Sequence, residues 1–481
     1  MNYNPFYYGS GILAGAKEVT VSKPNTFVKL LPLIDYFFIT CPEFGAKEGF
    51  EKERILFFYP TGEVLKKQID VTGYSDAVYN FTDNFNSKSK LLERHEFEHR
   101  YITTDKYSQV MIRVENGRFT IGLSLKKKEC KDSDYMIHLK TIKIQLVNSY
   151  LLFKLFNGTI TTYLNKDKEY CKSILNNFFL EYLDVMKLNT MPLIDLFNGV
   201  DMLPLKPPIL LMVERFVAHL IDQFPEIEKI MMLYQDRLVW HSVPKQDLLI
   251  LFTYVTKSLL STSTINELQP ESFNSRRLSL TFGSGKFIAG IPENGEECKK
   301  VFLTNTQSPN EVESFKMVVF RCLNATICLF MKKEPTLDSL TPLGKYFDCH
   351  LPSVASDLGE NVIISIKPLM QDVPIHYIYH NPLTLSLSTS FVPSTDLSSI
   401  RPNITKHVLK LTLETYDHFI NEKDPYGHIQ VKSNDDWFIY FKKFNYRLVI
   451  LFYYDPNNTS NDNTEYFNRI LKKYMENILL A

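Results

Sequence analysis

Glycine is scarce in this sequence, with 18 among 481 residues, against an average usage near ~7%. Proteins that hold nucleotide phosphates rely on glycine-rich loops that open a helix. No G-x-G-x-x-G occurs, and the stretch 283–286 (GSGK) is no P-loop, because Leu280 and Phe287 replace the required glycine and hydroxyl residue. This stretch predicts a tight turn between two strands. The sequence therefore carries no nucleotide-binding signature of its own.

Cysteine is equally uninformative about chemistry. The seven cysteines are scattered, odd in number and never paired as C-x-x-C. That usage fits a reducing compartment and argues against a disulfide framework or a zinc site. We expect each thiol to be a small buried side chain.

Net charge and long apolar runs are also lacking. Basic and acidic residues number 54 each, for a formal net charge of zero, which argues against nucleic acid as a partner. The longest apolar runs, such as 209–213 and 248–252, fall far short of the ~18 residues that span a bilayer. The N-terminus has no basic region followed by an apolar one, so no signal peptide is predicted. We expect a cytoplasmic protein that attaches to membranes only peripherally.

Apolar residues are abundant, at 44% with 13% aromatic, and at ~150 residues per domain the length suggests about three domains. Each third of the chain has β-type runs, a helical stretch, further β-type runs and another helical stretch. This order predicts an α+β fold in which helices flank antiparallel sheets. The predicted units are a loose arm at 1–30, domains at 31–190, 226–350 and 351–481, and a linker with a helix at 191–225. The prolines between 335 and 360 are interpreted as a second linker.

A short helix in the first domain follows Ser75, which is a suitable N-cap. Its apolar side would consist of Ala77, Val78, Phe81 and Phe85, near helical spacing. We interpret this stripe as core. The opposite, exposed side would carry polar residues.

One dense basic cluster stands out, formed by Lys126, Lys127, Lys128 and Lys131. The pattern places it on a loop after the strand at 109–114. Two readings remain open, an ordinary solvated loop or a docking patch for acidic lipid or protein.

The stretch from His95 to His99 (HEFEH) satisfies H-E-x-x-H, the helical zinc motif of metalloproteases. Its neighbours are charged, and no third-ligand motif follows. With period two, Phe97, His99 and Tyr101 instead share one face of a strand, which is the interpretation we favour over a zinc hydrolase. No nucleophile, base and orienting group assemble anywhere in the sequence. We predict no catalytic residues, no metal and no cofactor.

Several strings resemble the vacuolar fusion protein Ccz family. They include 33–38 (LIDYFF), 154–159 (KLFNGT), 195–200 (DLFNGV) and 233–240 (LYQDRLVW), in matching order and spacing. The resemblance covers 33–260 closely and the remainder in pattern and length, although Cys41 precedes Pro42 where the family tends to have asparagine.

The resemblance implies three longin domains, each a five-stranded antiparallel sheet with flanking helices. It also implies a Mon-family longin partner, a Rab-seven-type small GTPase and a possible third scaffold subunit. Together such subunits form a guanine-nucleotide exchange factor, and the first longin domains carry the exchange surface. The candidate contact residues here lie on the loop 48–51 and the exposed side of the first helix: Glu48, Glu51, Asp76, Asn80, Asp83 and Asn84.

Exchange needs no covalent chemistry, because a surface that binds the nucleotide-free GTPase more tightly is enough to weaken its hold on phosphate and Mg²⁺. The absence of a catalytic constellation therefore fits this expectation. The alternative is a longin adaptor or tether that binds membrane machinery without promoting exchange.

Overall fold

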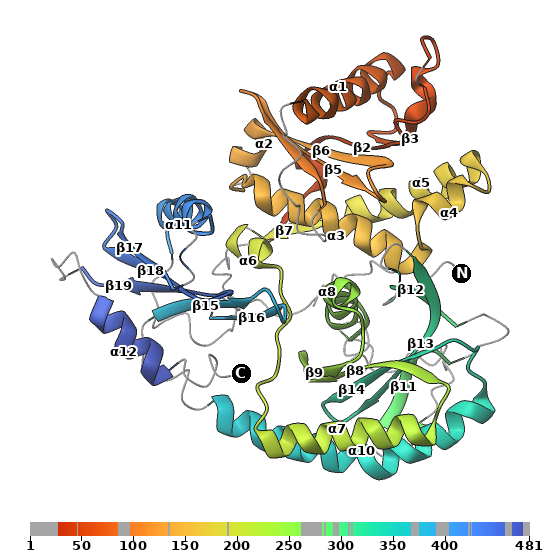
Figure 1. Cartoon of the computed structure of the whole chain (residues 1–481), viewed down its shortest axis with the longest axis vertical. Helices are drawn as coiled ribbons and strands as arrows, with labels where there is room; N and C mark the ends of the chain where they lie inside the picture. The colour runs from red at the N-terminus through yellow and green to blue at the C-terminus, as the bar shows by residue number, and fades with distance from the viewer. Residues whose placement is uncertain are drawn as a thin grey trace, which may run out of the picture. The chain divides into compact units, whose positions relative to one another are not determined.

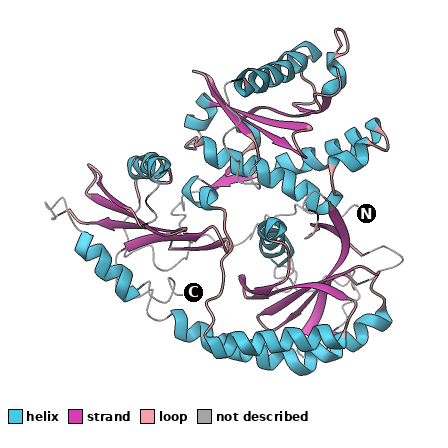
Figure 2. Ribbon diagram, viewed as in Figure 1, coloured by secondary structure: helices cyan, strands magenta, loops and turns pink. Residues whose placement is uncertain are grey.

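The structure is a computed structural model that describes residues 27–45, 47–84, 97–132, 135–189, 192–260, 281–282, 285–291, 298–305, 308, 311–366, 375–390, 404–421, 424, 426–456 and 464–474. Within these residues the chain forms two compact units. The first runs up to residue 196 and also includes 257–260, 308 and 311–312; the second holds the remaining described residues. The first unit holds one domain and the second holds two (Figures 1 and 2). Most of the predicted arm, 1–26, lies outside the described residues.

The first domain is built on a five-stranded antiparallel sheet with the order β3-β2-β6-β5-β4. Its strands are β2 (Ile34–Thr40), β3 (Ile55–Tyr59), β4 (His99–Thr103), β5 (Tyr107–Val114) and β6 (Phe119–Lys126). Helix α1 (Leu65–Asp83) covers one face, while α3 (Leu139–Asn157) and α5 (Lys168–Val185) cover the other (Figure 1). The remaining elements are β1 (Phe27–Lys29), η1 (Leu31–Leu33), η2 (Glu51–Arg54), α2 (Lys127–Asp132), α4 (Ile160–Leu164), β7 (Lys187–Asn189) and α6 (Pro192–Phe197). Strand β1 pairs with β7, so the end of the predicted loose arm is ordered.

The two faces of this sheet differ in chemistry. On the α3–α5 face the strands alternate large apolar side chains inward, and Phe37, Ile39, Ile112, Ile121 and Leu123 belong to one large buried cluster. On the α1 face the apolar cluster is small and contains Phe38, Phe58, Tyr79 and Met111. The hydrophobic free energy that holds the domain together therefore comes mainly from the α3–α5 side.

The second domain has a seven-stranded sheet in which β11, β13, β14, β8 and β9 are neighbours in that order. Its strands are β8 (Ile227–Tyr234), β9 (Arg237–His241), β10 (Thr281–Phe282), β11 (Gly285–Ala289), β12 (Lys300–Thr304), β13 (Val312–Cys322) and β14 (Ala325–Met331). Its helices are α7 (Pro207–Gln223), α8 (Lys245–Tyr254), the π-helix η3 (Val255–Leu260) and α10 (Leu337–Ile366). Residues 283 and 284 of the predicted turn lie outside the described residues; the strands on either side of them pair, Phe282 with Gly285.

Helix α10 corrects the predicted border between the second and third domains. The prolines at 342 and 352 lie inside this helix and mark no linker, and the border at 350 falls in its middle. Buried residues on both sides of that border, from Leu340 to Val362, pack into the second domain's core together with α7. The apolar residues recur at helical spacing and are buried along one side of α10, which keeps the chain helical despite the two prolines.

The third domain repeats the five-stranded plan, with the order β16-β15-β19-β18-β17. Its strands are β15 (Ile375–Asn381), β16 (Ser386–Thr389), β17 (His428–Lys432), β18 (Trp437–Phe444) and β19 (Arg447–Tyr454), and its helices are α11 (Lys406–Phe419) and α12 (Thr464–Tyr474). In all three domains the five principal strands, numbered within the domain, are ordered second, first, fifth, fourth, third. The predicted α+β fold with three antiparallel sheets is confirmed, and the second sheet carries β10 and β12 in addition.

Candidate functional site

Helix α1 turns a polar face toward the sheet. Its buried residues are Thr72, Ser75 and Tyr79, which share one stripe because they are three and four positions apart. Of the predicted core stripe, only Val78 packs against the apolar cluster on this face. Ala77 is exposed and Phe81 is 65% exposed, while Phe85 lies outside the described residues. The helix also begins eleven residues earlier than predicted, so Ser75 lies in its interior rather than at a cap.

The sheet explains why α1 lies this way. Beneath the helix Thr40 of β2 is paired with Thr120 of β6, which is paired with Arg113 of β5, so a polar row crosses three strands. Two pairs further along, on the same face, Phe38 lies against Gly122, where a Cβ would come within 2.3 Å of the Phe38 ring. The helix therefore meets a sheet surface that is largely polar, with one small aromatic cluster.

The other two domains provide an internal comparison. Helices α8 and α11 occupy the same place in the chain order as α1, directly after the second strand of their domains. The buried side of α8 includes Leu248, Leu251 and Phe252, and that of α11 includes Val408, Leu409 and Leu413. Only α1 of these three helices has a mainly polar buried face. Two of its three aromatic residues, Tyr74 at 51% exposure and Phe81 at 65%, face outward.

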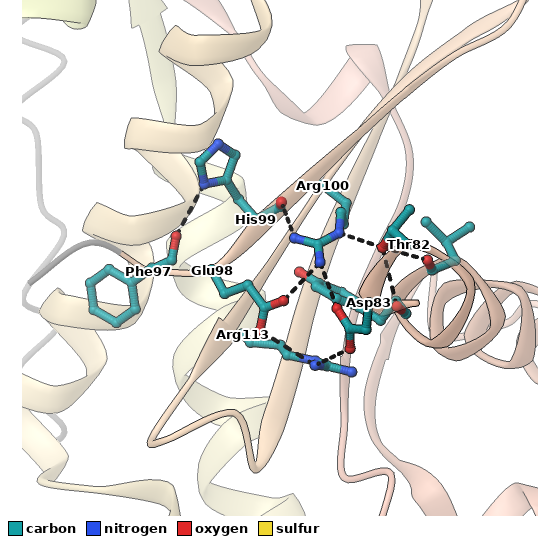
Figure 3. Close-up of polar contacts among 9 residues, drawn as sticks. Thr82, Asp83, Phe97, Glu98, His99, Arg100 and Arg113 are labelled. Atoms are coloured by element: carbon teal, nitrogen blue, oxygen red, sulfur yellow. Dashed lines mark hydrogen bonds and ion pairs between the residues drawn. The ribbon is translucent and has the colours of Figure 1, made fainter. Parts of the chain in front are cut away.

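Two arginines hold the C-terminal end of α1 (Figure 3). Arg100 of β4 contacts Asp83 at 2.7 Å and Glu98 at 2.9 Å, and its Nε donates to the Thr82 hydroxyl. Arg113 of β5 contacts both carboxylates at 3.3 Å. Both guanidinium groups lie over the Tyr79 ring, at 4.9 and 4.1 Å from its centroid. Charge and cation–π contacts thus replace part of the apolar packing that α1 lacks.

Four hydroxyls in this interface are buried and make no hydrogen bond with the described residues, namely those of Thr40, Ser75, Tyr79 and Thr120. Burial raises the pKa of the Tyr79 hydroxyl. A buried polar group without a partner costs roughly 1–3 kcal/mol. The interface between α1 and the sheet is therefore less stable than an apolar interface of the same size.

The loop before η2 adjoins the same helix. Glu48 is exposed in its turn, and Phe50 is 58% exposed at its end. Glu51 begins η2 and accepts a hydrogen bond from the Gly49 N–H at 3.0 Å; bonds from its own and the Gly49 backbone N–H lower the pKa of the Glu51 carboxyl. At the end of η2, Arg54 contacts Asp76 of α1 at 2.9 Å.

The structure divides the predicted contact residues into two groups. Asn80 and Asn84 of the helix and Glu48 of the loop are exposed, as the prediction required. Asp83 is exposed as well, but it pairs with Arg100 and Arg113. Asp76 and Glu51 are only partly exposed, and Asp76 pairs with Arg54. The sequence analysis did not assign these arginines a role. Side chains alternate between the two faces of a strand, and this alternation could have placed Arg100 and Arg113 on the face that a helix covers.

The basic cluster does not lie on a loop. Lys126 ends β6, and Lys127, Lys128 and Lys131 belong to α2, so the cluster lies where a strand passes into a helix. The sequence analysis predicted neither β6 nor this junction. Lys127 is bonded through its ammonium to the Thr104 carbonyl, while Lys128 and Lys131 are exposed. The Lys127 N–H donates to Lys106 O at 2.8 Å, which brings a fifth lysine to the cluster.

The region of the H-E-x-x-H motif is a strand where it is described. His99 begins β4 and its Nδ1 lies 3.1 Å from Phe97 O, so the helix that the zinc reading needs is absent there; His95 and Glu96 lie outside the described residues. Among the residues that the structure describes, no group of three or more His, Cys, Asp or Glu is arranged to hold a metal ion, and no helix is long and apolar enough to cross a bilayer.

Comparison with known proteins gives the same domain plan. The model for the first longin domain of INTU, CCZ1 and HPS4 matches residues 34–158, and those for the second and third Intu longin-like domains match 227–348 and 371–470. The vacuolar fusion protein CCZ1 homolog of Nematostella vectensis is 27% identical over 439 residues, covering 87% of this chain and 92% of that protein. The Xenopus tropicalis homolog is 25% identical over 473 residues, covering 92% and 96%. The chain belongs to the Ccz family.

The matched stretches locate the candidate surface within this Ccz-family chain. The first longin match begins at the first residue of β2 and ends just after α3. It therefore contains the loop before η2, all of α1, the two arginines at its end and the basic cluster. The second match ends inside α10, whose packing continues to Val362.

Proposed function

We propose that this chain is one subunit of a heterodimeric guanine-nucleotide exchange factor that activates a Rab-seven-type GTPase, with a Mon-family longin protein as its partner. Its membership of the Ccz family, with the three longin domains in order, supports a role in vacuolar fusion and vesicle trafficking. A third scaffold subunit completes the proposed assembly. It would promote endosome maturation and the fusion of autophagosomes and vesicles with the lysosome or vacuole.

The main support for the proposed contact surface is the way α1 packs: its buried face is mainly polar, unlike those of the equivalent helices. The equivalent helices of the other two domains bury their apolar residues, whereas α1 exposes Tyr74 and Phe81. Exposed aromatic residues on a regular element are enriched where proteins bind one another. The proposed contact surface is the outer side of α1 with Asn80 and Asn84, together with Glu48 and Glu51 of the adjoining loop.

Exchange by such a surface requires only differential binding. A Rab retains its nucleotide through Mg²⁺, a P-loop lysine and an ordered switch loop. A surface that prefers the nucleotide-free form shifts the population toward release, in proportion to that preference. This chain then needs no nucleophile, cofactor or metal of its own.

The deciding experiment mixes the purified chain and its Mon-family partner with a Rab-seven protein loaded with fluorescent GDP. We expect GDP release to rise well above the intrinsic rate, and the chain alone to have little effect. Co-purification of the two subunits without faster release would contradict the exchange proposal. It would favour the adaptor or tether.

Membrane attachment in this proposal is peripheral, at late endosomes, lysosomes or vacuoles and autophagosomes. The docking candidates are the exposed Lys128 and Lys131, with Lys126 and Lys127 beside them. Near an anionic surface each such lysine contributes about 1 kcal/mol. Replacing Lys128 and Lys131 by glutamine should weaken binding to vesicles rich in anionic lipid, measured by co-sedimentation. Unchanged binding would leave the cluster as a solvated surface.

A further inference from the structure

A single side chain joins the two segments of the proposed contact surface. Arg54 donates from Nη1 to Asp76 of α1 at 2.9 Å and from Nη2 to the Gly45 carbonyl at 3.0 Å. Both members of the ion pair are largely buried, with side-chain exposures of 15% and 17%. The guanidinium thus bonds to the helix and to the loop before η2 at once.

The loop is shaped to receive this contact. Gly45 has φ +70, and a Cβ there would lie 2.6 Å from Phe50 O, so only glycine fits the turn. Phe50 N donates to Lys47 O, and Phe50 O accepts from Glu53 N. A bond to the Gly45 carbonyl therefore fixes one end of a tightly folded turn whose other end carries Phe50 and Glu51.

The chemistry of this link calls for arginine. A guanidinium has donors in a rigid plane and can serve two acceptors in different directions, whereas an ammonium is a point charge on a flexible stem. Burial raises the pKa of the Asp76 carboxyl, and the Arg54 charge opposes that rise. Buried ion pairs of this kind contribute little net stability compared with apolar side chains, so stability alone does not account for the pair.

We propose that Arg54 and Asp76 are positioning residues that hold the turn at Lys47–Glu51 and helix α1 in one fixed arrangement, so that both meet the GTPase as a single preformed surface. This inference rests on the proposed exchange function. It removes Asp76 from the set of direct contacts. It assigns the contacts instead to the exposed residues on either side of the link, Phe50 on the loop and Asn80 on the helix.

The first test measures the link without the GTPase. In the complex with the Mon-family partner, Arg54→Lys keeps the charge and loses the two-acceptor geometry. Loss of a charged hydrogen bond should speed local opening by about tenfold or more, seen as faster amide hydrogen exchange in 47–53. The control Lys67→Met removes the exposed Lys67–Glu63 pair of the same region and should leave 47–53 unchanged. Wild-type protection in Arg54→Lys would overturn the proposal.

The second test separates positioning from stability. In Arg54→Met/Asp76→Leu both charges become apolar, so the melting temperature should stay near that of the wild type. We expect kcat/KM for GDP release to fall about tenfold in this variant, with a smaller change at saturating GTPase. Full exchange activity in the double variant would overturn the proposal. A wild-type complex without exchange activity would instead refute the proposed function, and the hydrogen-exchange result for the link would stand.

Discussion

At the scale of single residues, the first domain departs from the usual rule that buried polar groups are paired. Two threonines face each other across β2 and β6 under α1, and neither hydroxyl has a hydrogen-bond partner among the described residues. On the opposite side of the same domain Thr141 is equally buried, and its hydroxyl donates to the Pro192 carbonyl at 3.2 Å. The two environments therefore predict opposite effects for the same substitution.

Changing both Thr40 and Thr120 to valine should stabilise the chain by about 1–3 kcal/mol, because valine has nearly the same shape and no buried hydroxyl. Thr141→Val is the matched control and should destabilise it by about 1 kcal/mol or more, since the hydroxyl loses its bonds with the Pro192 carbonyl and with His138. Urea denaturation of the purified chain measures both. A loss of stability in the double variant would mean that the two hydroxyls are satisfied in solution.

A buried carboxyl gives a pH-dependent prediction. Burial raises the pKa of Asp195 to about 6, although the Asn189 N–H donates to it at 2.8 Å and Lys257 also favours its charge. The folded state therefore binds a proton that the unfolded state releases, so this residue's contribution to stability falls as the pH rises from about 4 to 6. Between pH 4.5 and 7.5 the loss should be about 2 kcal/mol.

Asp195→Asn removes this titration. The wild type should lose about 2 kcal/mol of unfolding free energy between pH 4.5 and pH 7.5 through this carboxyl, and the variant should not. The difference between the two proteins therefore changes by about 2 kcal/mol in favour of the variant. The exposed Asp184→Asn serves as the control. Equal pH dependence in wild type and Asp195→Asn, measured by urea denaturation at both pH values, would show that the carboxyl has an ordinary pKa.

At the scale of elements, local pattern was a good guide to strands and a poor guide to the orientation of α1. Runs such as Ile34–Thr40 and Arg447–Tyr454 are rich in aromatic and β-branched residues, and both are strands. The apolar residues of α1 suggested a core stripe, but the face that the helix buries depends on residues distant in sequence. Arg113 and Thr120 determine that face from β5 and β6, and no local period reports such a contact.

Because the interface between α1 and the sheet is mainly polar, we expect α1 to be less protected from hydrogen exchange than the other long helices of its domain. Amides in the middle of α1 should exchange through local opening at lower free energy than those of α3 and α5, which pack on the large apolar cluster. Mass spectrometry of the whole chain at pH 7 resolves these helices. Equal protection in all three helices would mean that the arginine contacts at Asp76 and Asp83 fully compensate for the missing apolar area.

At the scale of the whole molecule, the number of domains followed from length and from the repeated order of elements. The strand order that the three domains share (second, first, fifth, fourth, third) could not be predicted from local sequence, because long-range pairing such as that of β2 with β6 decides which strands are neighbours. The candidate surface was predicted in part: the loop and α1 were chosen from the resemblance, and the arginines that connect them to the sheet were not. Proline gave the wrong domain border because Pro342 and Pro352 are tolerated within a helix that is held by its apolar side.

That border supplies a final prediction. Leu358 is fully buried and lies eight residues beyond the predicted end of the second domain, yet it belongs to the core shared with α7 and the sheet. Leu358→Ala should therefore cost about 2–5 kcal/mol, whereas Glu360→Ala, exposed on the same helix, should change stability by less than about 0.5 kcal/mol. Urea denaturation followed through the second domain's Trp240 measures the loss, with the tryptophan of the third domain replaced by phenylalanine in every variant. If Leu358→Ala left this transition in place, the C-terminal half of α10 would not be part of the second domain, and the border near 350 would be right after all.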